Sequence, residues 1–357
     1  MTTQRTRKAR LAQFVGSLAV TTLLIATIAE TYSISSVWDL LRGTPTTAVL
    51  AYLLISLGAL GVRALRYGLI LEDAVGKRNA PGIGALLTLT AIRNALVDLL
   101  PARLGELSFF YVLSRYRIRP ATALTTFALT LVLDLVVLAG IVLFALILVS
   151  LDVFVFPQAG GTELNGKSAL LLGLVGLLAL GALLYRLEHL VRFSSWVGEA
   201  LLRPFSHPWI ATARRALSTI AAEFGQIRAS RHYWLLVFLT VVLRFAKYGA
   251  LYLLLLGVVQ PLGIGFDQIP FPLAAAAFIA AEASASLPFS GIMGFGAYEG
   301  AASLAFLSAG INIPAVPSVI LVVHLITQIV GYSIGLLGGA VFTIRELKGN
   351  GRKNGDA

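Results

Sequence analysis

The 357-residue sequence contains no cysteine and few charged residues. The lack of cysteine excludes thiol catalysis, cysteine-ligated metals and disulfide bonds. Only 13% of the residues are charged, whereas a soluble domain has about 25%. Apolar residues make up 57% of the chain, and its mean hydropathy is +0.85. Because this composition offers too little polar surface to solvate a globule, it predicts that much of the protein surface faces lipid.

The motifs of soluble enzymes and of nucleic-acid-binding domains are also missing. The four histidines show no metal-binding spacing, and no phosphate-binding loop or Ser-His-Asp order is present. The Gly294-x-Gly296 pair lies in an apolar stretch without a preceding strand, so it is not a dinucleotide loop. The net charge of +11 comes mostly from connections between apolar runs, which indicates membrane topology and anionic lipids rather than nucleic acid. We therefore expect no cofactor, no metal and no catalytic residue.

Six apolar runs have the length of a membrane span, and two further runs do not. About 20 apolar residues cross a bilayer core. The six predicted spans are 11–29, 46–71, 121–149, 168–186, 233–257 and 315–343. The first follows a basic segment and resembles a signal peptide, but its length and the lack of a cleavage site predict a span that stays.

The two remaining runs, 83–115 and 271–309, are too long for one span and too short for two. Each is interrupted in its middle by helix-breaking residues: Pro101 and Gly105 in the first, and Pro288, Gly291, Gly294 and Gly296 in the second. Broken helices at membrane depth occur where they are buried in protein or line a cavity. We therefore predict that both runs are helical hairpins.

Loop charges predict that each hairpin returns to the side on which it starts. In that topology 19 of the 28 Lys and Arg residues share one side with both tails, and the opposite connections keep only Arg42 and Lys167. The positive-inside rule then places both tails in the cytoplasm. The predicted fold is an all-α polytopic protein of the inner (cytoplasmic) membrane. It has six full transmembrane helices and two opposed re-entrant broken-helix hairpins.

The order of these elements repeats within a single integral membrane domain, residues 1–357. Residues 11–149 and 168–343 each contain two spans, a broken hairpin and a third span. An odd number of crossings per half gives an inverted repeat, an architecture of many secondary transporters. We expect the breaks at Pro101 and Pro288 to face each other. The connection 187–232 is amphipathic and is either an interfacial helix or a cytoplasmic cap.

Several ionisable residues fall within the predicted membrane segments. They are Arg63, Arg66, Arg93, Asp98, Arg103, Glu106, Asp134, Arg244, Lys247, Glu282 and Glu299. Such groups are costly at membrane depth, so they form a structural network or line a polar path. In the functional interpretation Arg103, next to a helix N-terminus, binds a phosphate, while Glu106 accepts a cationic or hydroxyl group or a proton. In the structural interpretation Arg63 and Arg66 snorkel to the surface, and Glu299 stabilises a helix N-terminus.

A row of glycines marks the last predicted span. Gly331, Gly335 and Gly339 are four residues apart, which indicates a face for close helix–helix packing.

Five short motifs occur along the chain in a characteristic order. They are Arg63-Ala-Leu-Arg66, Pro101-x-Arg103-x-Gly105-Glu106, Asp134, Glu282 followed by Leu287-Pro288, and Gly294-x-Gly296-x-x-Glu299. Together they resemble the lysylphosphatidylglycerol synthase/flippase transmembrane family, which includes the membrane half of the multiple peptide resistance factor and stand-alone homologues. The resemblance implies a region that moves a lipid with a polar headgroup across the membrane. In the family an arginine often lies shortly before the counterpart of Asp134, but here residues 129–133 are Leu-Thr-Leu-Val-Leu.

The expected function is therefore a flippase for a phospholipid or a lipid-linked polar headgroup. Its partners are membrane lipids with anionic or phosphate-bearing headgroups, and a homo-oligomer and a partner enzyme that makes the lipid both fit these features. Two alternatives stay open: an intramembrane transferase that uses carboxylates such as Asp98, Glu106 and Asp134, and a transporter of small solutes or ions.

Overall fold

The computed structural model describes residues 34–150, 170–171, 173–182, 184–186, 232–287, 292–309 and 315–355, and the single positions 22, 196, 197, 200, 218, 222, 225, 230, 311 and 313. Within these residues all regular structure is helical. The longer helices are α3 (Thr46–Val75), α4 (Ile83–Leu99), α6 (Pro120–Ser150), α9 (Tyr233–Val259), α10 (Phe271–Ala285) and α12 (Val316–Gly355). The shorter ones are α2 (Ile34–Gly43), η1 (Pro101–Glu106), α5 (Leu107–Arg115), η2 (Gln260–Leu262), η3 (Ile292–Gly294) and α11 (Ala297–Ser308).

Four of the described helices are long and apolar enough to cross a membrane. Their apolar segments are Thr46–Val75, Pro120–Phe144, Tyr233–Leu262 and Val316–Leu347. They coincide with four of the six predicted spans, and the chain is a polytopic α-helical membrane protein. The predicted span 11–29 and almost all of the connection 187–232 lie outside the described residues. The predicted span 168–186 is described in part, as an apolar helix.

The first hairpin comprises α4, η1 and α5. Helix α4 ends before Leu100, whose extended backbone (φ −96°, ψ 133°) is the conformation preferred before a proline. The 3-10 helix η1 then turns the chain, and α5 packs back against α4. Gly105 makes this turn possible, because a Cβ there would lie 2.0 Å from the carbonyl carbon of Leu96. Any larger residue would force the two halves of the hairpin apart.

The second hairpin comprises α10, η3 and α11, and its turn has a different backbone. Met293, Gly294 and Gly296 have φ of 58°, 78° and 94°, in the region that favours glycine. The hydroxyl of Ser284 donates to the carbonyl oxygen of Ala297 at 2.8 Å, which joins the end of α10 to the start of α11. Pro288 and Gly291 lie outside the described residues.

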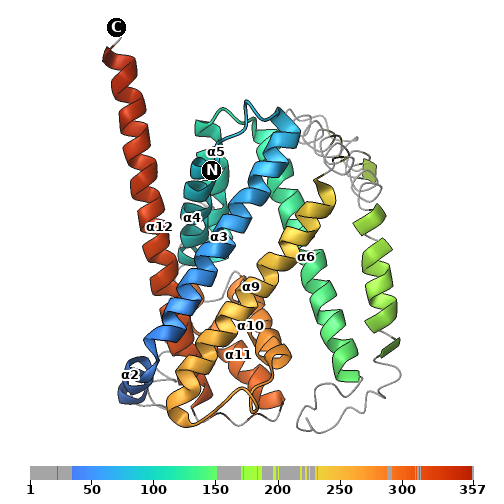
Figure 1. The fold of residues 1–357 in the computed structure, drawn as a ribbon, viewed down its shortest axis with the longest axis vertical. Helices are drawn as coiled ribbons and strands as arrows, with labels where there is room; N and C mark the ends of the chain where they lie inside the picture. The colour runs from blue at the N-terminus through green and yellow to red at the C-terminus, as the bar shows by residue number, and fades with distance from the viewer. Residues whose placement is uncertain are drawn as a thin grey trace, which may run out of the picture.

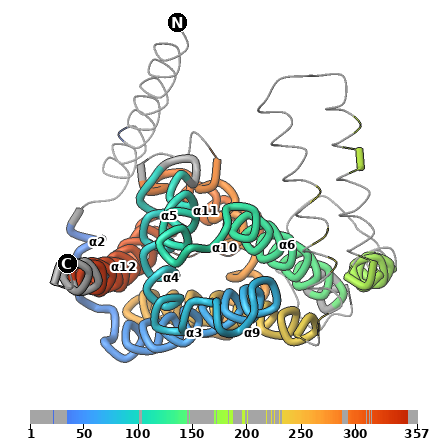
Figure 2. Tube along the Cα trace, turned by 90° about the horizontal axis from the view of Figure 1, so that it is seen from above, coloured from blue at the N-terminus to red at the C-terminus, as the bar shows by residue number. Residues whose placement is uncertain are grey.

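The two hairpins occupy opposite halves of the molecule. In Figure 1 α4 and α5 lie in the upper half and α10 and α11 in the lower half, while α3, α9 and α12 run past both. Seen from above, the hairpins lie between α12 and α6, and α3 and α9 cover a third side (Figure 2). The turns η1 and η3 are in contact, so the two breaks meet inside the helix assembly.

Small residues bring α4 and α12 together, but the predicted glycine face is only partly correct. Gly335 lies against Ala95 and Gly338 lies against Ala91, so close that an added Cβ would overlap each alanine methyl group. Gly331 and Gly339, in contrast, have open space around them. The contact face therefore follows Gly335 and Gly338, three residues apart, because residues at this spacing also share one side of a helix.

One element was not predicted from the sequence. The short helix α2 lies in the predicted connection after the first span, and its Leu40 is buried in the core around α9 and α10. Gly43 of this helix lies against Pro261 of η2. Helix α2 therefore covers the ends of the helices on the side where the second hairpin begins.

Candidate functional site

A polar cavity of about 350 Å³ lies where the two hairpins meet the long helices. Its walls come from α3, α4, η1, α6, α9, α10, η3, α11 and α12. Nine of the eleven charged residues selected from the sequence line it: Arg63, Arg66, Arg93, Asp98, Glu106, Asp134, Arg244, Lys247 and Glu282. Helices remote in sequence thus bring these charges into one space.

Asp134 of α6 joins two arginines from different helices. Arg66 of α3 is 1% exposed, and its Nη1 lies 2.8 Å from Asp134 Oδ1. Arg244 of α9 approaches the other carboxylate oxygen, with its Nη2 at 3.5 Å. The positive partners of Asp134 thus come from α3 and α9, rather than from the preceding turn of α6. Removing one partner of a buried ion pair costs about 3–5 kcal/mol, so Asp134 fixes these three helices around the cavity.

A second ion pair joins the two arms of the first hairpin. Arg93 of α4 contacts Glu106 at the end of η1 at two points, with Nε to Oε2 at 2.6 Å and Nη2 to Oε1 at 2.7 Å. Such two-point contacts combine charge with fixed geometry. Glu106 is therefore occupied by Arg93 and braces the turn of the hairpin.

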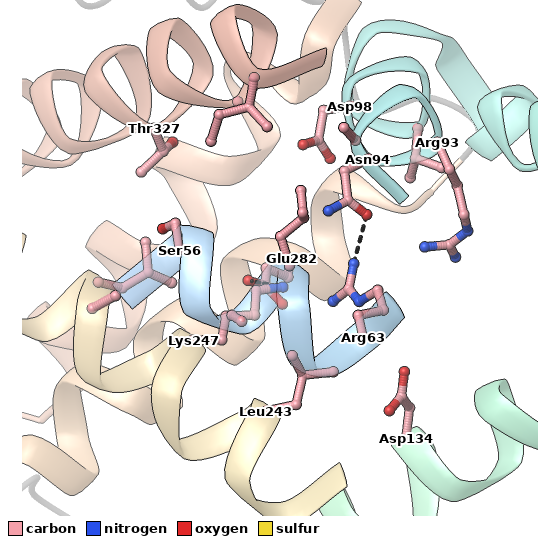
Figure 3. Close-up of a pocket in the computed structure, with 18 of the residues that line it drawn as sticks. Ser56, Arg63, Arg93, Asn94, Asp98, Asp134, Leu243, Lys247, Glu282 and Thr327 are labelled. Atoms are coloured by element: carbon pink, nitrogen blue, oxygen red, sulfur yellow. Dashed lines mark hydrogen bonds and ion pairs between the residues drawn. The ribbon is translucent and has the colours of Figure 1, made fainter. Parts of the chain in front are cut away.

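Arg63 and Asp98 differ from the other charges because neither has an oppositely charged partner among the described residues. The Nη1 of Arg63 donates to the amide oxygen of Asn94 at 2.6 Å. Asp98, one turn further along α4, is exposed to the cavity and makes no hydrogen bond within the described part of the chain. Figure 3 shows Asp98 and Asn94 side by side, with the guanidinium of Arg63 extended toward Asn94. These two groups are available to a ligand.

The last charges in the cavity come from α9 and the second hairpin. Lys247 Nζ lies 2.7 Å from Glu282 Oε1, and the hydroxyl of Tyr248 donates to Glu282 Oε2 at 3.4 Å. Asp98 lies within electrostatic range of both Lys247 and Glu282. The carboxylates of Asp98 and Glu282 and the single ammonium of Lys247 therefore make this part of the cavity negative. The other part is positive, because Arg63, Arg66, Arg93 and Arg244 outnumber Glu106 and Asp134. We call these four arginines the arginine cluster.

Glu299 does not line the cavity, although it was selected as a ligand-binding residue. It is 1% exposed and lies in the first turn of α11, where it accepts a hydrogen bond from the backbone N–H of Gly296. Its other oxygen lies 2.6 Å from Nδ1 of His324, a residue of α12 that does line the cavity. The interpretation of Glu299 as a group that stabilises a helix N-terminus therefore fits its surroundings.

The turns that carry the predicted breaks are only partly described. Arg103 lies within η1, before the first turn of α5, and its side chain and that of Pro101 are outside the described atoms. Gly105 packs on α4, and Gly294 lines the cavity beside Met293. Within the described residues, no group of three or more His, Asp or Glu side chains has a metal-binding arrangement.

Sequence reasoning missed several residues that complete the cavity. Asn94, His324 and Gln328 are uncharged, so a search for ionisable groups in apolar runs passes over them or tests them only for metal spacing. One signal was available: His324 and Gln328 are four residues apart on the last span, and therefore share one helix face.

The fold, the charged cavity and the motif order can now be compared with known proteins. A family model described as the lysylphosphatidylglycerol synthase TM region matches residues 14–335. The chain belongs to this family. A comparison with curated proteins finds no match. Membership in the lysylphosphatidylglycerol synthase TM region family confirms the resemblance drawn from the motifs. It makes the chain a membrane protein of a family that handles lipid headgroups.

Proposed function

We propose that this protein moves a lipid with a phosphate-bearing headgroup from one leaflet of the cytoplasmic membrane to the other. The observation that carries the proposal is the charged cavity, which both hairpins and the long helices α3, α6, α9 and α12 build inside an otherwise apolar molecule. Ionisable groups at membrane depth line paths for polar ligands. A headgroup enters this cavity while its acyl chains stay in lipid.

The arginine cluster is the proposed phosphate site. Arg63 contributes most to the selectivity, because its hydrogen-bond partner is a neutral amide and it forms no ion pair within the described part of the chain. A guanidinium binds phosphate through two parallel N–H···O contacts, and these are stronger than bonds between neutral groups. Arg66 and Arg244 supply further positive charge, since both share the single carboxylate of Asp134. The proposed phosphate lies between Arg63 and these residues.

Asp98 and Glu282 are the proposed contacts for the rest of the headgroup. Asp98 has no partner among the described residues, so it can accept a hydroxyl or an ammonium group without breaking an ion pair of that part of the chain. The Lys247–Glu282 pair is more exposed than the buried Arg66–Asp134 pair, with side chains 37% and 25% exposed. It can therefore rearrange at lower cost.

The acyl chains are proposed to leave the cavity between α6 and the first hairpin. Leu131 of α6 and Leu100 before η1 both line the cavity, and both are 38% exposed. Next to them, Leu135 and Leu104 are 56% and 49% exposed. Apolar side chains at the edge of a charged cavity suit a ligand that has a polar head and apolar tails.

The proposed membrane placement follows the loop charges. The two hairpins are re-entrant from opposite sides, both tails are cytoplasmic, and the halves 11–149 and 168–343 form an inverted repeat. Rocking of one half against the other exposes the cavity to each leaflet in turn. The contact between η1 and η3 supports this proposal, because it lies where the two halves meet.

The test is translocation of fluorescent phosphatidylglycerol in liposomes that contain the purified full-length chain. Dithionite quenches the label in the outer leaflet, so the protected fraction reports movement between leaflets. We expect Arg63→Ala to slow this movement by roughly ten- to a hundredfold, since a hydrogen bond to a charged group contributes about 1.5–3 kcal/mol. Arg63→Lys should recover only part of the rate, because it lacks the guanidinium fork.

Arg115→Ala is the matched control, since it removes an arginine that pairs with Glu346 outside the cavity. A wild-type rate equal to that of protein-free liposomes would reject the flippase. A wild-type rate in Arg63→Ala would reject the phosphate site. Uptake of soluble glycerol phosphate at a comparable rate would favour a solute transporter, and a new lipid product from the purified protein would favour a transferase.

A further inference from the structure

A polar cluster in the wall of the cavity joins the second hairpin to α12. It consists of Glu299, His324 and Gln328, and we call it the buried triad. His324 Nδ1 lies 2.6 Å from Glu299 Oε1, and Gln328 Nε2 lies 2.8 Å from His324 Nε2. The side chains of His324 and Glu299 are only 4% and 1% exposed. The phosphate site proposed above uses none of these groups.

The contacts of the buried triad fit a neutral imidazole. With the amide nitrogen of Gln328 placed toward the ring, Nε2 of His324 is the acceptor of that hydrogen bond and carries no proton. The proton on Nδ1 then points to Glu299, whose second oxygen accepts the N–H of Gly296. A neutral imidazole thus lies between a carboxylate and an amide donor.

Binding of one proton would reverse a hydrogen bond in the buried triad. A proton on His324 Nε2 turns an acceptor into a donor, and the Gln328 amide must then rotate to present its oxygen. Glu299 compensates the new positive charge directly through Nδ1. Both protonation states can therefore be satisfied by the same three side chains, which differ only in the direction of one bond.

The buried triad reaches the cavity, and buried polar groups follow it along the chain. Of its members, His324 and Gln328 line the cavity. Along the chain, between the buried triad and the connection from α11 to α12, are two buried serines, Ser303 one turn after Glu299 on α11 and Ser318 in the first turn of α12, which are 5% and 0% exposed. Neither hydroxyl has a hydrogen-bond partner among the described residues. Two partnerless buried hydroxyls can bind water between the buried triad and that end of the molecule.

The ring of His324 is also in contact with the break in the second hairpin. Tyr298 stacks on it with ring centroids 4.2 Å apart, and Phe295 lies at 4.6 Å. These two aromatic residues flank Gly296, where the backbone has φ of 94°. A change at the imidazole therefore acts directly on the turn from which α11 starts.

From this geometry we propose that the buried triad is a proton-binding site, and that proton binding by His324 controls how strongly the second hairpin is tied to α12. The titratable groups that interact with the site directly are Tyr298 on α11, which stacks on His324, and Asp98 on α4. Beyond them, groups that interact with Tyr298 or Asp98 are Glu282 on α10, Lys247 and Tyr248 on α9, Tyr52 on α3 and Tyr332 on α12. The coupling to lipid movement rests on the proposed function, whereas the proton site itself does not.

The proton site is tested by the ring ¹⁵N signals of histidine in the full-length protein in lipid nanodiscs. The chain has only four histidines, and His324→Gln assigns the relevant pair of signals. We expect Nε2 of His324 to gain a proton as the pH is lowered, because histidine is the side chain suited to reversible proton binding. Glu299→Gln should alter this transition, because the imidazolium loses its carboxylate.

His232→Gln is the matched control. His232 also pairs with a carboxylate, that of Asp73, but it lies just before α9 and does not line the cavity. It should leave the His324 signals unchanged. Signals that keep one tautomer over the whole pH range would overturn the proton site. If His324→Gln does not fold, Gln328→Leu provides the same test. It leaves the histidine in place and removes the amide that has to rotate when Nε2 of His324 binds a proton.

Coupling is tested in the fluorescent phosphatidylglycerol assay with a pH gradient across the liposome membrane. A coupling free energy of about 1–3 kcal/mol predicts that the gradient changes the wild-type rate by roughly fivefold or more. His324→Gln and Gln328→Leu should abolish this response, while His232→Gln keeps it. Titration of His324 without any lipid movement would reject the proposed function alone. Lipid movement that ignores both the gradient and the His324 substitution would reject the coupling alone.

Discussion

The two hairpins share a sequence pattern but hold their breaks in different ways. In each, a proline and a glycine are followed by a glutamate at the start of the second helix, Glu106 in the first hairpin and Glu299 in the second. Glu106 pairs with Arg93 within its own hairpin, and the two side chains are 13% and 15% exposed. Glu299 pairs with His324 on the neighbouring α12 and is shielded almost completely from solvent.

This difference assigns different physical roles to the two breaks. Arginine keeps its charge at every physiological pH, so the first hairpin is tied to itself by a permanent ion pair. Histidine can bind a proton, so under the proposal above the tie between the second hairpin and α12 changes with the protonation of His324. The first hairpin is therefore expected to behave as a rigid part of the cavity and the second as the part that responds.

The largest expected effect comes from the turn of the first hairpin. Gly105→Ala places a methyl group on the backbone of Leu96, at 2.0 Å, and backbone cannot move aside as a side chain can. We expect a loss of about 3 kcal/mol or more in the free energy of unfolding, at the upper end of overpacking effects. Thermal unfolding of the purified protein in detergent measures it.

Gly296→Ala in the second hairpin should cost less, about 1–2 kcal/mol, because the penalty there is backbone strain at positive φ. Gly300→Ala is the control, since no atom lies within 4 Å of its added Cβ. Equal losses for Gly105→Ala and Gly296→Ala would show that the two turns are equally rigid and would remove the contrast.

The next effect separates the two glutamates by pH. Glu106→Gln leaves the cation of Arg93 without its carboxylate, so it should destabilise by about 1–3 kcal/mol at any pH near neutrality. If His324 binds a proton as proposed, the cost of Glu299→Gln should depend on pH, because only the protonated His324 forms an ion pair that the substitution removes.

The measurement is the free energy of unfolding of each variant at several pH values, relative to wild type. The double variant Glu106→Gln/Glu299→Gln should show the sum of both losses, because the pairs share no residue. A pH-independent cost of Glu299→Gln would contradict the distinction between a permanent and a titratable tie.

Much of this arrangement follows from sequence, because the hydropathy of a segment predicts the length of its helix and isolated charges within it mark ionisable residues at membrane depth. The four long helices, the break at Pro101 and the charges that line the cavity were all predicted from these two properties. The burial of Glu299 was not, because it depends on which side chain of α12 faces α11. The packing face of α12 was also only partly predicted: Gly335 was selected correctly, but the prediction included Gly331 and Gly339 and missed Gly338.

Uncharged polar residues were the other gap. Asn94 and Gln328 carry no formal charge, and their roles appear only once Arg63 and His324 lie beside them. Helix α2 was missed for a related reason, since a ten-residue helix is too short for the hydropathy of a span.

The smallest expected effect compares serine hydroxyls in the two hairpins. Ser108 of α5 donates to the carbonyl oxygen of Gly105 at 2.6 Å, so Ser108→Ala removes a formed hydrogen bond and should cost about 1 kcal/mol. Ser303 of α11 has no partner among the described residues, and Ser303→Ala should change the free energy of unfolding by less than about 0.5 kcal/mol. Matched unfolding curves measure both.

The two serines therefore test whether the second hairpin contains polar groups that its own packing leaves unsatisfied. A loss in Ser303→Ala as large as that in Ser108→Ala would show that the Ser303 hydroxyl is bound to protein, and the route from the buried triad toward the α11–α12 connection would then be closed by that bond. A small loss in unfolding free energy, combined with a weaker response of lipid movement to the pH gradient, would place the hydroxyl on the proton route. Ser108→Ala should leave that response unchanged, because the first hairpin holds its break with groups that do not titrate near neutral pH.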